Sequence, residues 1–230
     1  MIILAFDTCF GACSAAVYGA NANNTLAQRF EVMDKGHSER LIPMLAEVLA
    51  GAGCALRDVS TLAVTVGPGS FTGVRTGLAV ARSLVLAHAC EIRGTTSLHV
   101  MAAGVRAMRA EGPIAIAVAT RDDLVYFAAF EGTELAQTVA PCLATPRDAA
   151  RRIATSPHTI AGSGATLVAA VHSAGDCAHR VITEPVFARA DLLAGMTVRL
   201  PVLAPPRPLY LREADAKPAA AGTLSFAPAP

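Results

Sequence analysis

The sequence predicts an α/β protein built as two lobes with mixed sheets. Strand and helix patterns alternate through the first half of the chain, a Gly-Pro pair at residues 112–113 breaks them, and strand patterns restart directly afterwards. With 230 residues, the chain is long enough to bury a sizeable core in one large domain or in two small lobes. We place a first lobe at residues 1–110 and a second, reduced lobe at residues 111–230, which ends in a tail rich in proline and alanine.

The first part of the chain shows four strand patterns and two helix patterns. Apolar and β-branched runs indicate strands at residues 1–6, 13–18, 26–32 and 61–66. One helix begins at Ser38 and ends at Gly51 or Gly53, and a second covers residues 72–89. This order of three strands, helix, strand and helix is typical of one lobe of the actin, sugar-kinase and chaperone ATPase superfamily.

The second part of the chain is marked more weakly. A third helix, at residues 98–109, precedes the Gly-Pro break, and strands follow at residues 114–120 and 124–130. Thr145 and Pro146 are the N-cap and first-turn residues that begin a short helix. The remaining patterns are a strand at residues 159–161 with a Gly-Ser-Gly turn and a helix after it, a helix at residues 190–196, and an extended segment at residues 201–230 with a frayed end.

A glycine-rich segment, GPGSFTGVRTG at residues 67–77, is the most informative motif. It connects a predicted strand to a predicted helix. Gly67 and Gly69 can adopt a positive φ, and Ser70 is a favourable N-cap residue, so the turn can direct backbone N–H groups at an anion. Its spacing matches neither the Walker motif nor the dinucleotide-binding fingerprint. A tight strand-to-helix connection without a ligand explains the same residues.

The segment at residues 67–77 resembles the signature of the TsaB (YeaZ) family, the bacterial accessory subunits of tRNA threonylcarbamoyladenosine synthesis. Other segments resemble the family in the same order: MIILAFDT at residues 1–8, CSAAV at 13–17, HSERLIPML at 37–45 and PLYLR at 208–212. Together they extend over most of the chain. The resemblance implies a reduced, two-lobed actin-like and sugar-kinase-like (ribonuclease H-like) fold.

The resemblance also implies an accessory function without catalysis by this chain. Members of the family bind and activate the catalytic paralogue TsaD. With the small ATPase TsaE, that subunit transfers a threonylcarbamoyl group to N6 of the adenosine next to the tRNA anticodon. We therefore expect a protein that binds TsaD or forms a homodimer, meets tRNA only indirectly, and has no catalytic residue.

Composition argues against several other classes of protein. The 19 basic and 18 acidic residues give a formal net charge of +1, a poor electrostatic footprint for independent RNA binding. No apolar run approaches the ~18 residues of a membrane span, and the first residues lack a basic leader, so we expect a cytoplasmic protein. The six cysteines and six histidines form no local metal-ligand pair, and we predict no metal site.

Nucleotide or phosphate binding is a further hypothesis. In the superfamily, the turn after the first strand lies near the nucleotide phosphates, and an acid and a hydroxyl stand at the matching positions here. The candidate phosphate-binding residues are Asp7, Thr8, Gly67, Gly69 and Ser70. ATP or ADP with magnesium would then bind at the interface of the complex. The alternative is that Asp7 caps its own turn by accepting hydrogen bonds from backbone N–H groups.

The second lobe offers little to complete such a site. The family usually has Asp-Ala-Arg at the second turn, whereas this chain has Ala119-Thr120-Arg121, which lacks the acid. The segment at residues 162–164 is the candidate for the adenosine end, and it also fits a plain strand-to-helix turn. A small independent ATPase or kinase of the same fold is therefore the alternative function. A peptidase is argued against by the missing metal ligands and nucleophile.

The two helices of the first lobe are the candidate partner surface. On the second helix, Val74 and Leu78 belong to one apolar row, and Gly77 and Val80 belong to another. One row can cover the sheet of this chain, and the other packs either on the first helix or on another subunit. Family members use these helices to bind TsaD or themselves. The resemblance therefore places the interface at His37, Arg40, Leu41, Met44, Leu45, Phe71, Thr72, Val74, Arg75, Gly77, Leu78 and Ala81.

Overall fold

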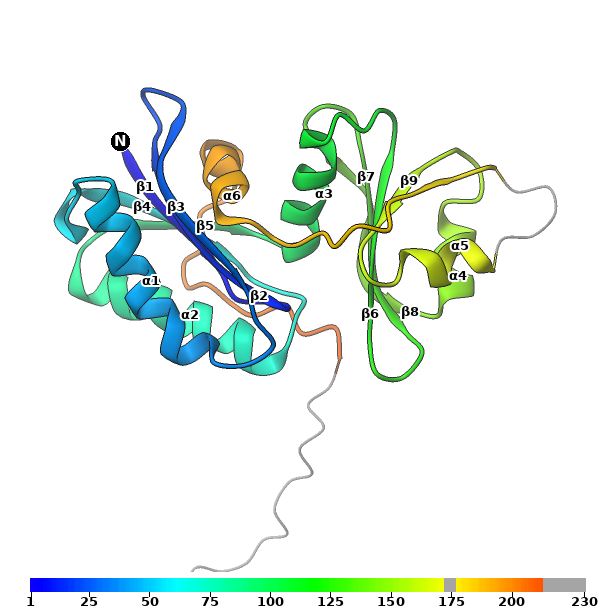
Figure 1. Cartoon of the computed structure of the whole chain (residues 1–230), viewed down its shortest axis with the longest axis horizontal. Helices are drawn as coiled ribbons and strands as arrows, with labels where there is room; N and C mark the ends of the chain where they lie inside the picture. Colours follow the sequence, from blue (N-terminus) through cyan, green and yellow to red (C-terminus); the bar gives the residue numbers. More distant parts are fainter. Residues whose placement is uncertain (172–176, 213–230) are drawn as a thin grey trace, which may run out of the picture.

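The computed structural model describes residues 1–171 and 177–212 (Figure 1). Two five-stranded sheets lie side by side, with the strand orders β3-β2-β1-β4-β5 and β10-β9-β6-β7-β8. The predicted fold class, a two-lobed α/β protein with mixed sheets, is confirmed. The part of the predicted tail that follows residue 212 lies outside the described residues.

The first sheet is mixed and is covered on both faces. Its strands are β1 (Ile2–Asp7), β2 (Ala12–Gly19), β3 (Asn24–Val32), β4 (Val59–Thr65) and β5 (Glu91–Thr95). β1 pairs antiparallel with β2 and parallel with β4, and β4 pairs parallel with β5. Figure 1 shows α1 (His37–Gly51) and α2 (Phe71–Ala87) on one face and α6 (Ala190–Met196) on the other.

The side chains of β1 alternate between two hydrophobic cores. Ile3 and Ala5 belong to the cluster that contains Leu193 of α6, whereas Leu4 and Phe6 belong to the cluster formed with α1 and α2. The side chains of these four residues are all buried. A strand that is covered on both faces requires apolar residues at successive positions, which explains the continuous apolar run in the sequence.

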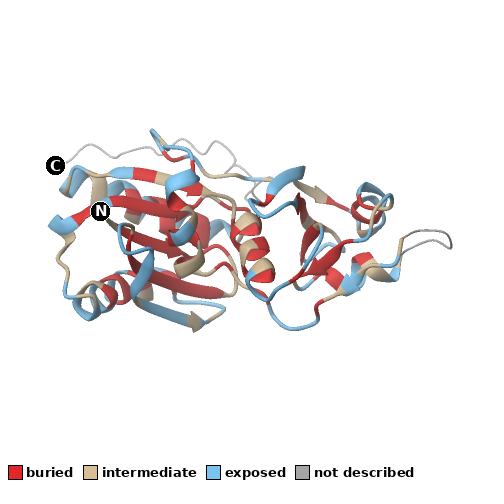
Figure 2. Ribbon diagram, turned by 90° about the horizontal axis from the view of Figure 1, so that it is seen from above, coloured by how far each residue is buried: buried red, intermediate tan, exposed pale blue. Residues whose placement is uncertain are grey.

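The second sheet repeats the plan of the first. Its strands are β6 (Ile114–Ala119), β7 (Val125–Glu131), β8 (Ala136–Ala144), β9 (Thr159–Ala161) and β10 (Arg180–Val181). β6 takes the place of β1, since it pairs antiparallel with β7 and parallel with β9. The remaining helices are α3 (Ser97–Ala107), α4 (Pro146–Arg152), α5 (Ala165–Ala170) and the short 3₁₀ helices η1 (Leu56–Asp58) and η2 (Thr197–Arg199). α3 lies beside α6 between the sheets and joins them in one buried cluster (Figure 1, Figure 2).

The predicted elements agree closely with the observed ones. β9 and α6 have the predicted ranges, and Thr145 caps α4 as predicted, because its hydroxyl accepts a hydrogen bond of 3.1 Å from the Asp148 N–H. Three strands, β5, β8 and β10, were not predicted. β5 and β10 are short, and β8 is an edge strand that contains Pro141 and whose residues, apart from Ala144, are exposed or only partly buried.

The chain returns to the first lobe after the second sheet. α6 packs on the first sheet, and beyond it the Leu203 N–H donates to the Ile92 carbonyl at 2.8 Å. Farther along, the Leu209 N–H donates to the Val66 carbonyl at 2.7 Å. The division of the chain near residue 110 stays a prediction, and residues 190–209 pack with the first sheet.

Candidate functional site

Asp7, at the end of β1, is buried and hydrogen-bonded within its own lobe. The Thr65 hydroxyl donates to Oδ1, and the Cys9 N–H donates to Oδ2 at 3.3 Å. Burial raises the pKa of Asp7 to about 6, and these hydrogen bonds partly oppose that rise. Burial also raises the pKa of the Cys9 thiol well above its usual range, so this thiol stays protonated. The carboxylate therefore holds its own turn, as the alternative interpretation of Asp7 predicts.

The glycine-rich turn packs directly on the turn that follows β1. A Cβ added at Gly69 would lie 2.2 Å from the Cys9 carbonyl oxygen, and one at Gly73 would lie 2.0 Å from the Thr8 carbonyl oxygen. Two hydrogen bonds of 2.7 Å join the same segments: the Ser70 N–H donates to the Cys9 carbonyl, and the Thr8 hydroxyl donates to the Gly73 carbonyl. The glycines permit this close approach of two backbones, for which a side chain would leave no space.

The other groups expected to bind phosphate are also engaged within the chain. The Ser70 hydroxyl caps α2 by accepting a hydrogen bond of 3.0 Å from the Gly73 N–H. Gly67 has a φ of 105°, and a Cβ there would lie 2.8 Å from the Leu209 carbonyl oxygen. The close-packed strand-to-helix connection accounts for the motif, and these contacts lend no support to phosphate binding by its glycines.

The second lobe uses the same packing device. A Cβ at Gly162 would lie 2.4 Å from the carbonyl oxygen of Ala117 in β6, and the Gly164 N–H donates to that carbonyl at 2.9 Å. The Ser163 hydroxyl accepts a hydrogen bond of 3.0 Å from the Ala119 N–H. In both lobes a glycine-containing turn therefore locks onto the end of the central strand, which favours the structural interpretation of the Gly-Ser-Gly segment.

An open cleft of about 530 Å³ lies between the two sets of turns. Its lining residues are Phe10, Pro68, Gly69, Ser70, Phe71, Ala119, Thr120, Arg121, Tyr126, Leu209, Tyr210, Leu211 and Arg212. Of the candidate phosphate-binding residues, Gly69 and Ser70 line this cleft, whereas Asp7, Thr8 and Gly67 do not. No sequence pattern indicated the aromatic lining. The PLYLR segment was the one signal that marked the C-terminal wall.

Most residues predicted for the partner interface are buried inside this chain, so they are not on its surface. They are His37, Leu41, Met44, Leu45, Val74, Gly77, Leu78 and Ala81. The apolar ones pack in the core under α1 and α2, and the His37 ring lies 2.9 Å, Nε2 to O, from the Phe10 carbonyl. Both apolar rows of α2 therefore have partners within the chain. The sequence pattern could not separate this arrangement from an intermolecular one.

The outward sides of α1 and α2 carry a different set of residues. Ile42 on α1 is 52% exposed and Leu86 on α2 is 89% exposed. Each of these outward faces also carries small exposed residues. Of the predicted interface residues, Phe71, Thr72 and Arg75 are exposed at the start of α2. The Arg75 guanidinium lies 3.5 Å from the centroid of the Phe71 ring.

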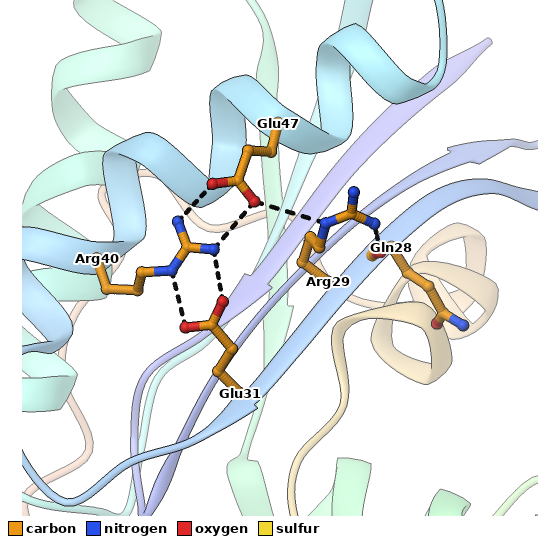
Figure 3. Close-up of polar contacts among 5 residues, drawn as sticks. All are labelled: Gln28, Arg29, Glu31, Arg40 and Glu47. Carbon is orange, nitrogen blue, oxygen red and sulfur yellow. Dashed lines mark hydrogen bonds and ion pairs between the residues drawn. The ribbon is translucent and has the colours of Figure 1, made fainter.

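Arg40, another predicted interface residue, is the centre of an ion-pair cluster within the chain (Figure 3). Its guanidinium donates to both oxygens of Glu31 at 2.5 and 2.8 Å and to both oxygens of Glu47 at 2.7 and 2.9 Å. Arg29 lies 3.5 Å from Glu47. The hydrogen bonds from Arg40 lower the pKa values of Glu31 and Glu47. The cluster joins α1 to the edge strand β3.

Two classes of feature are absent from residues 1–171 and 177–212. No helix there has the length and hydrophobicity that a membrane span requires. The same residues contain no group of three or more histidine, cysteine, aspartate or glutamate side chains that could hold a metal ion.

Comparison with known proteins identifies relatives along most of the chain. The family model for TsaD, the tRNA N6-adenosine threonylcarbamoyltransferase, matches residues 22–172. The Escherichia coli tRNA threonylcarbamoyladenosine biosynthesis protein TsaB is 35% identical over 134 residues, which are 58% of this chain and 57% of that protein. The Haemophilus influenzae TsaB protein is 35% identical, over 55% of this chain and 52% of that protein. These matches span little more than half the length of each relative.

A longer match and a structural match extend the comparison. An uncharacterized protein of Mycobacterium tuberculosis strain H37Rv is 31% identical over 96% of both chains. The crystal structure of a Pseudomonas aeruginosa protein, described by its similarity to peptidase YEAZ, superposes with a TM-score of 0.78 and 25% identity. It covers 92% of this chain and 99% of that one. The YeaZ structure from the same organism superposes with a TM-score of 0.76 and 23% identity, and it shares the fold.

Proposed function

Because the chain belongs to the TsaB (YeaZ) family, we propose that it serves tRNA threonylcarbamoyladenosine biosynthesis as a subunit without catalysis of its own. In this proposal it binds and activates the catalytic paralogue TsaD, acts alongside TsaE, and meets tRNA indirectly. The observation that carries the accessory role is that the turn after β1 is closed by contacts within the chain. Asp7 is buried and hydrogen-bonded, and the glycine-rich turn uses its close approach to pack on Cys9.

The outward faces of α1 and α2 are the surface we assign to the partner. Ile42 and Leu86 are large apolar side chains that lie mostly in solvent. Ala46 on α1, and Ala79 and Ser83 on α2, are exposed and small. A surface of this kind lets a partner helix approach closely and bury the apolar side chains. The same surface can pair with TsaD or with a second copy of this chain.

A charge introduced into this surface tests the assignment. We expect Ile42→Asp and Leu86→Asp each to weaken the complex with TsaD by about 30-fold or more, since an unpaired charge in an interface costs about 2–5 kcal/mol. Titration calorimetry measures binding, and circular dichroism checks the fold. Leu167→Asp, at an exposed leucine of α5, is the matched control. Normal binding by both helix variants would show that the interface lies elsewhere.

The alternative function, an independent ATPase or kinase, has a separate test. The buried Asp7 and the missing acid at Ala119 argue against turnover by this chain alone. We expect the purified protein to hydrolyse ATP no faster than buffer does. An ATPase rate that disappears in the Asp7→Ala variant would favour the enzyme over the accessory subunit.

A further inference from the structure

A second open cavity, of about 590 Å³, lies at the other edge of the second sheet from the cleft between the lobes. Its lining comes from residues 109–113, 157–159, 178 and 180. These segments lead into β6, β9 and β10, which run parallel, whereas the cleft lies beyond the end of β6. The proposed accessory function makes no use of this cavity, whose volume is in the range of small-molecule sites.

Two arginines without an ion-pair partner line the cavity. Arg109 follows α3 and Arg180 begins β10, and both are exposed. Neither guanidinium makes a hydrogen bond or an ion pair with another residue that the structure describes. The register places Arg180 opposite Thr159 of β9, and Thr159 opposite Ile114 of β6. The starts of β6 and β10 are therefore about 10 Å apart, so one small anion can meet both guanidinium groups.

The backbone of Arg109 is unusual for an arginine. This residue directly follows Met108, the C-cap of α3, and has a φ of 59°. Glycine is the usual residue at this position, because a side chain is disfavoured in the left-handed region. Arg106 holds the turn in place, since its guanidinium donates to the carbonyls of Ala110 at 2.5 Å and Gly112 at 2.8 Å. The Arg109 side chain is thus presented from a fixed turn that would itself accept glycine.

His158 adds a third nitrogen group to the lining, and it is 8% exposed. Its Nδ1 lies 2.7 Å from the Ser156 carbonyl oxygen, which can only accept, so Nδ1 carries the proton of that hydrogen bond. Nε2 makes no hydrogen bond with the described residues, and it can donate to an anion when the ring is protonated. The His158 N–H donates to Nδ1 of His179 at 3.0 Å, which fixes the segment before β9.

We propose that this cavity binds a phosphate monoester of the sugar-phosphate class. Arg109 and Arg180 hold the phosphate, because a guanidinium offers several N–H donors to its oxygens, and His158 donates from Nε2. Glu111 is the one acidic residue among the described lining residues. Its carboxylate can accept hydrogen bonds from sugar hydroxyl groups, which inorganic phosphate lacks.

The carboxylate of Glu111 gives the proposal a distinctive signature. It repels the phosphate and attracts the sugar, so its removal affects two ligands differently. We expect Glu111→Ala to bind inorganic phosphate more tightly than the unchanged protein does, and to lose most of the preference for ribose 5-phosphate.

Titration calorimetry on the full chain tests the proposal with ribose 5-phosphate, ribose and inorganic phosphate. We expect the sugar phosphate to bind at least ~10-fold more tightly than either fragment, as a ligand held at both ends requires. Arg180→Gln and Arg109→Gly should each weaken its binding by ~10-fold or more, since each removes charged hydrogen bonds. Arg147→Gln, at an exposed arginine of α4 outside the cavity, should leave binding unchanged.

Arg109→Gly also separates binding from folding. Glycine suits the left-handed backbone at this position, so the thermal unfolding midpoint should stay the same or rise while binding falls. A binding loss in this variant therefore cannot be ascribed to a damaged fold.

Four results would overturn the proposal. Normal binding by Arg109→Gly and Arg180→Gln would show that neither arginine holds the ligand. Equal losses in these variants and in Arg147→Gln would mean that the anion binds to general positive charge. A loss in Arg121→Gln alone would place the ligand in the cleft between the lobes. Equal binding of ribose 5-phosphate and inorganic phosphate would exclude a contact with the sugar. None of these measurements uses threonylcarbamoyl transfer or TsaD, so the outcome is independent of the accessory function.

Discussion

No space for a methyl group exists between Gly77 and Thr8. A Cβ at Gly77 of α2 would lie 2.9 Å from the Thr8 hydroxyl oxygen, which itself donates a hydrogen bond of 2.7 Å to the Gly73 carbonyl. One hydroxyl thus ties the turn after β1 to the first turn of α2, and Gly77 provides the space beside it. Gly77 is therefore buried within this chain beside Thr8, where its contact is intramolecular.

The first prediction concerns this contact. Gly77→Ala should destabilise the protein by about 1–2 kcal/mol, because the loss of a buried hydrogen bond outweighs the ~1 kcal/mol that alanine gains over glycine within a helix. Urea denaturation followed by circular dichroism measures the difference.

Gly104→Ala in α3 is the matched control for this change. Its added Cβ would lie 3.5 Å from the nearest atom, a side-chain carbon of Leu192, which is an ordinary contact. This variant should be as stable as the unchanged protein or more so. If Gly77→Ala gains as much stability as Gly104→Ala, the Thr8 hydroxyl contributes nothing to the fold.

The second prediction concerns pH. Burial raises the pKa of Asp7 from 3.8 to about 6, so the folded state binds the proton more tightly than the unfolded state does. The stabilisation from the protonated carboxyl is fully present below pH 4 and is lost as the pH rises through about 6. Compared with Asp7→Asn, which does not titrate, the unchanged protein should lose about 2–3 kcal/mol of relative stability between pH 4 and 7. Urea denaturation of both proteins at several pH values measures this difference, and a constant difference would contradict the raised pKa.

The third prediction concerns the cluster around Arg40. Arg40→Met removes the link between Glu31 and Glu47 and leaves two like charges close together, so the thermal unfolding midpoint should fall. The loss should shrink at high salt, because the surrounding charges are exposed and therefore screened. Differential scanning calorimetry at low and high salt measures both effects. Arg57→Met, at an exposed arginine of the same lobe, is the control. An equal fall of the thermal unfolding midpoint in both variants would show that the cluster has no specific effect on stability.

The sequence predicted those helices and strands whose local residue pattern agrees with their environment in the folded protein. The apolar run at residues 1–6 predicted the strand β1, and Thr145 with Pro146 marked the start of α4. β5 and β10 escaped prediction because they are short and are specified by pairing with strands distant in sequence. Such pairing depends on tertiary contacts that a local pattern does not contain.

The candidate site was predicted less well, for a related reason. The glycine-rich motif connects a strand to a helix, as predicted. Its spacing alone could not show whether its N–H groups face a ligand or a neighbouring turn. Similarly, helical periodicity identified two apolar rows on α2 and could not show that both are covered by this chain. The cleft combines Phe10 with Tyr126, which are far apart in the sequence, and neither residue stands in a recognisable motif.

The return of α6 to the first sheet has a consequence for how the protein can be divided. In topological terms, the second sheet is an insertion within the first lobe, since the chain leaves that lobe after β5 and re-enters it at α6. Truncation after residue 110 would remove α6 and uncover the side of β1 that carries Ile3 and Ala5. A fragment that keeps the core of the first lobe complete must therefore include α6, which begins nearly two hundred residues after the start of β1.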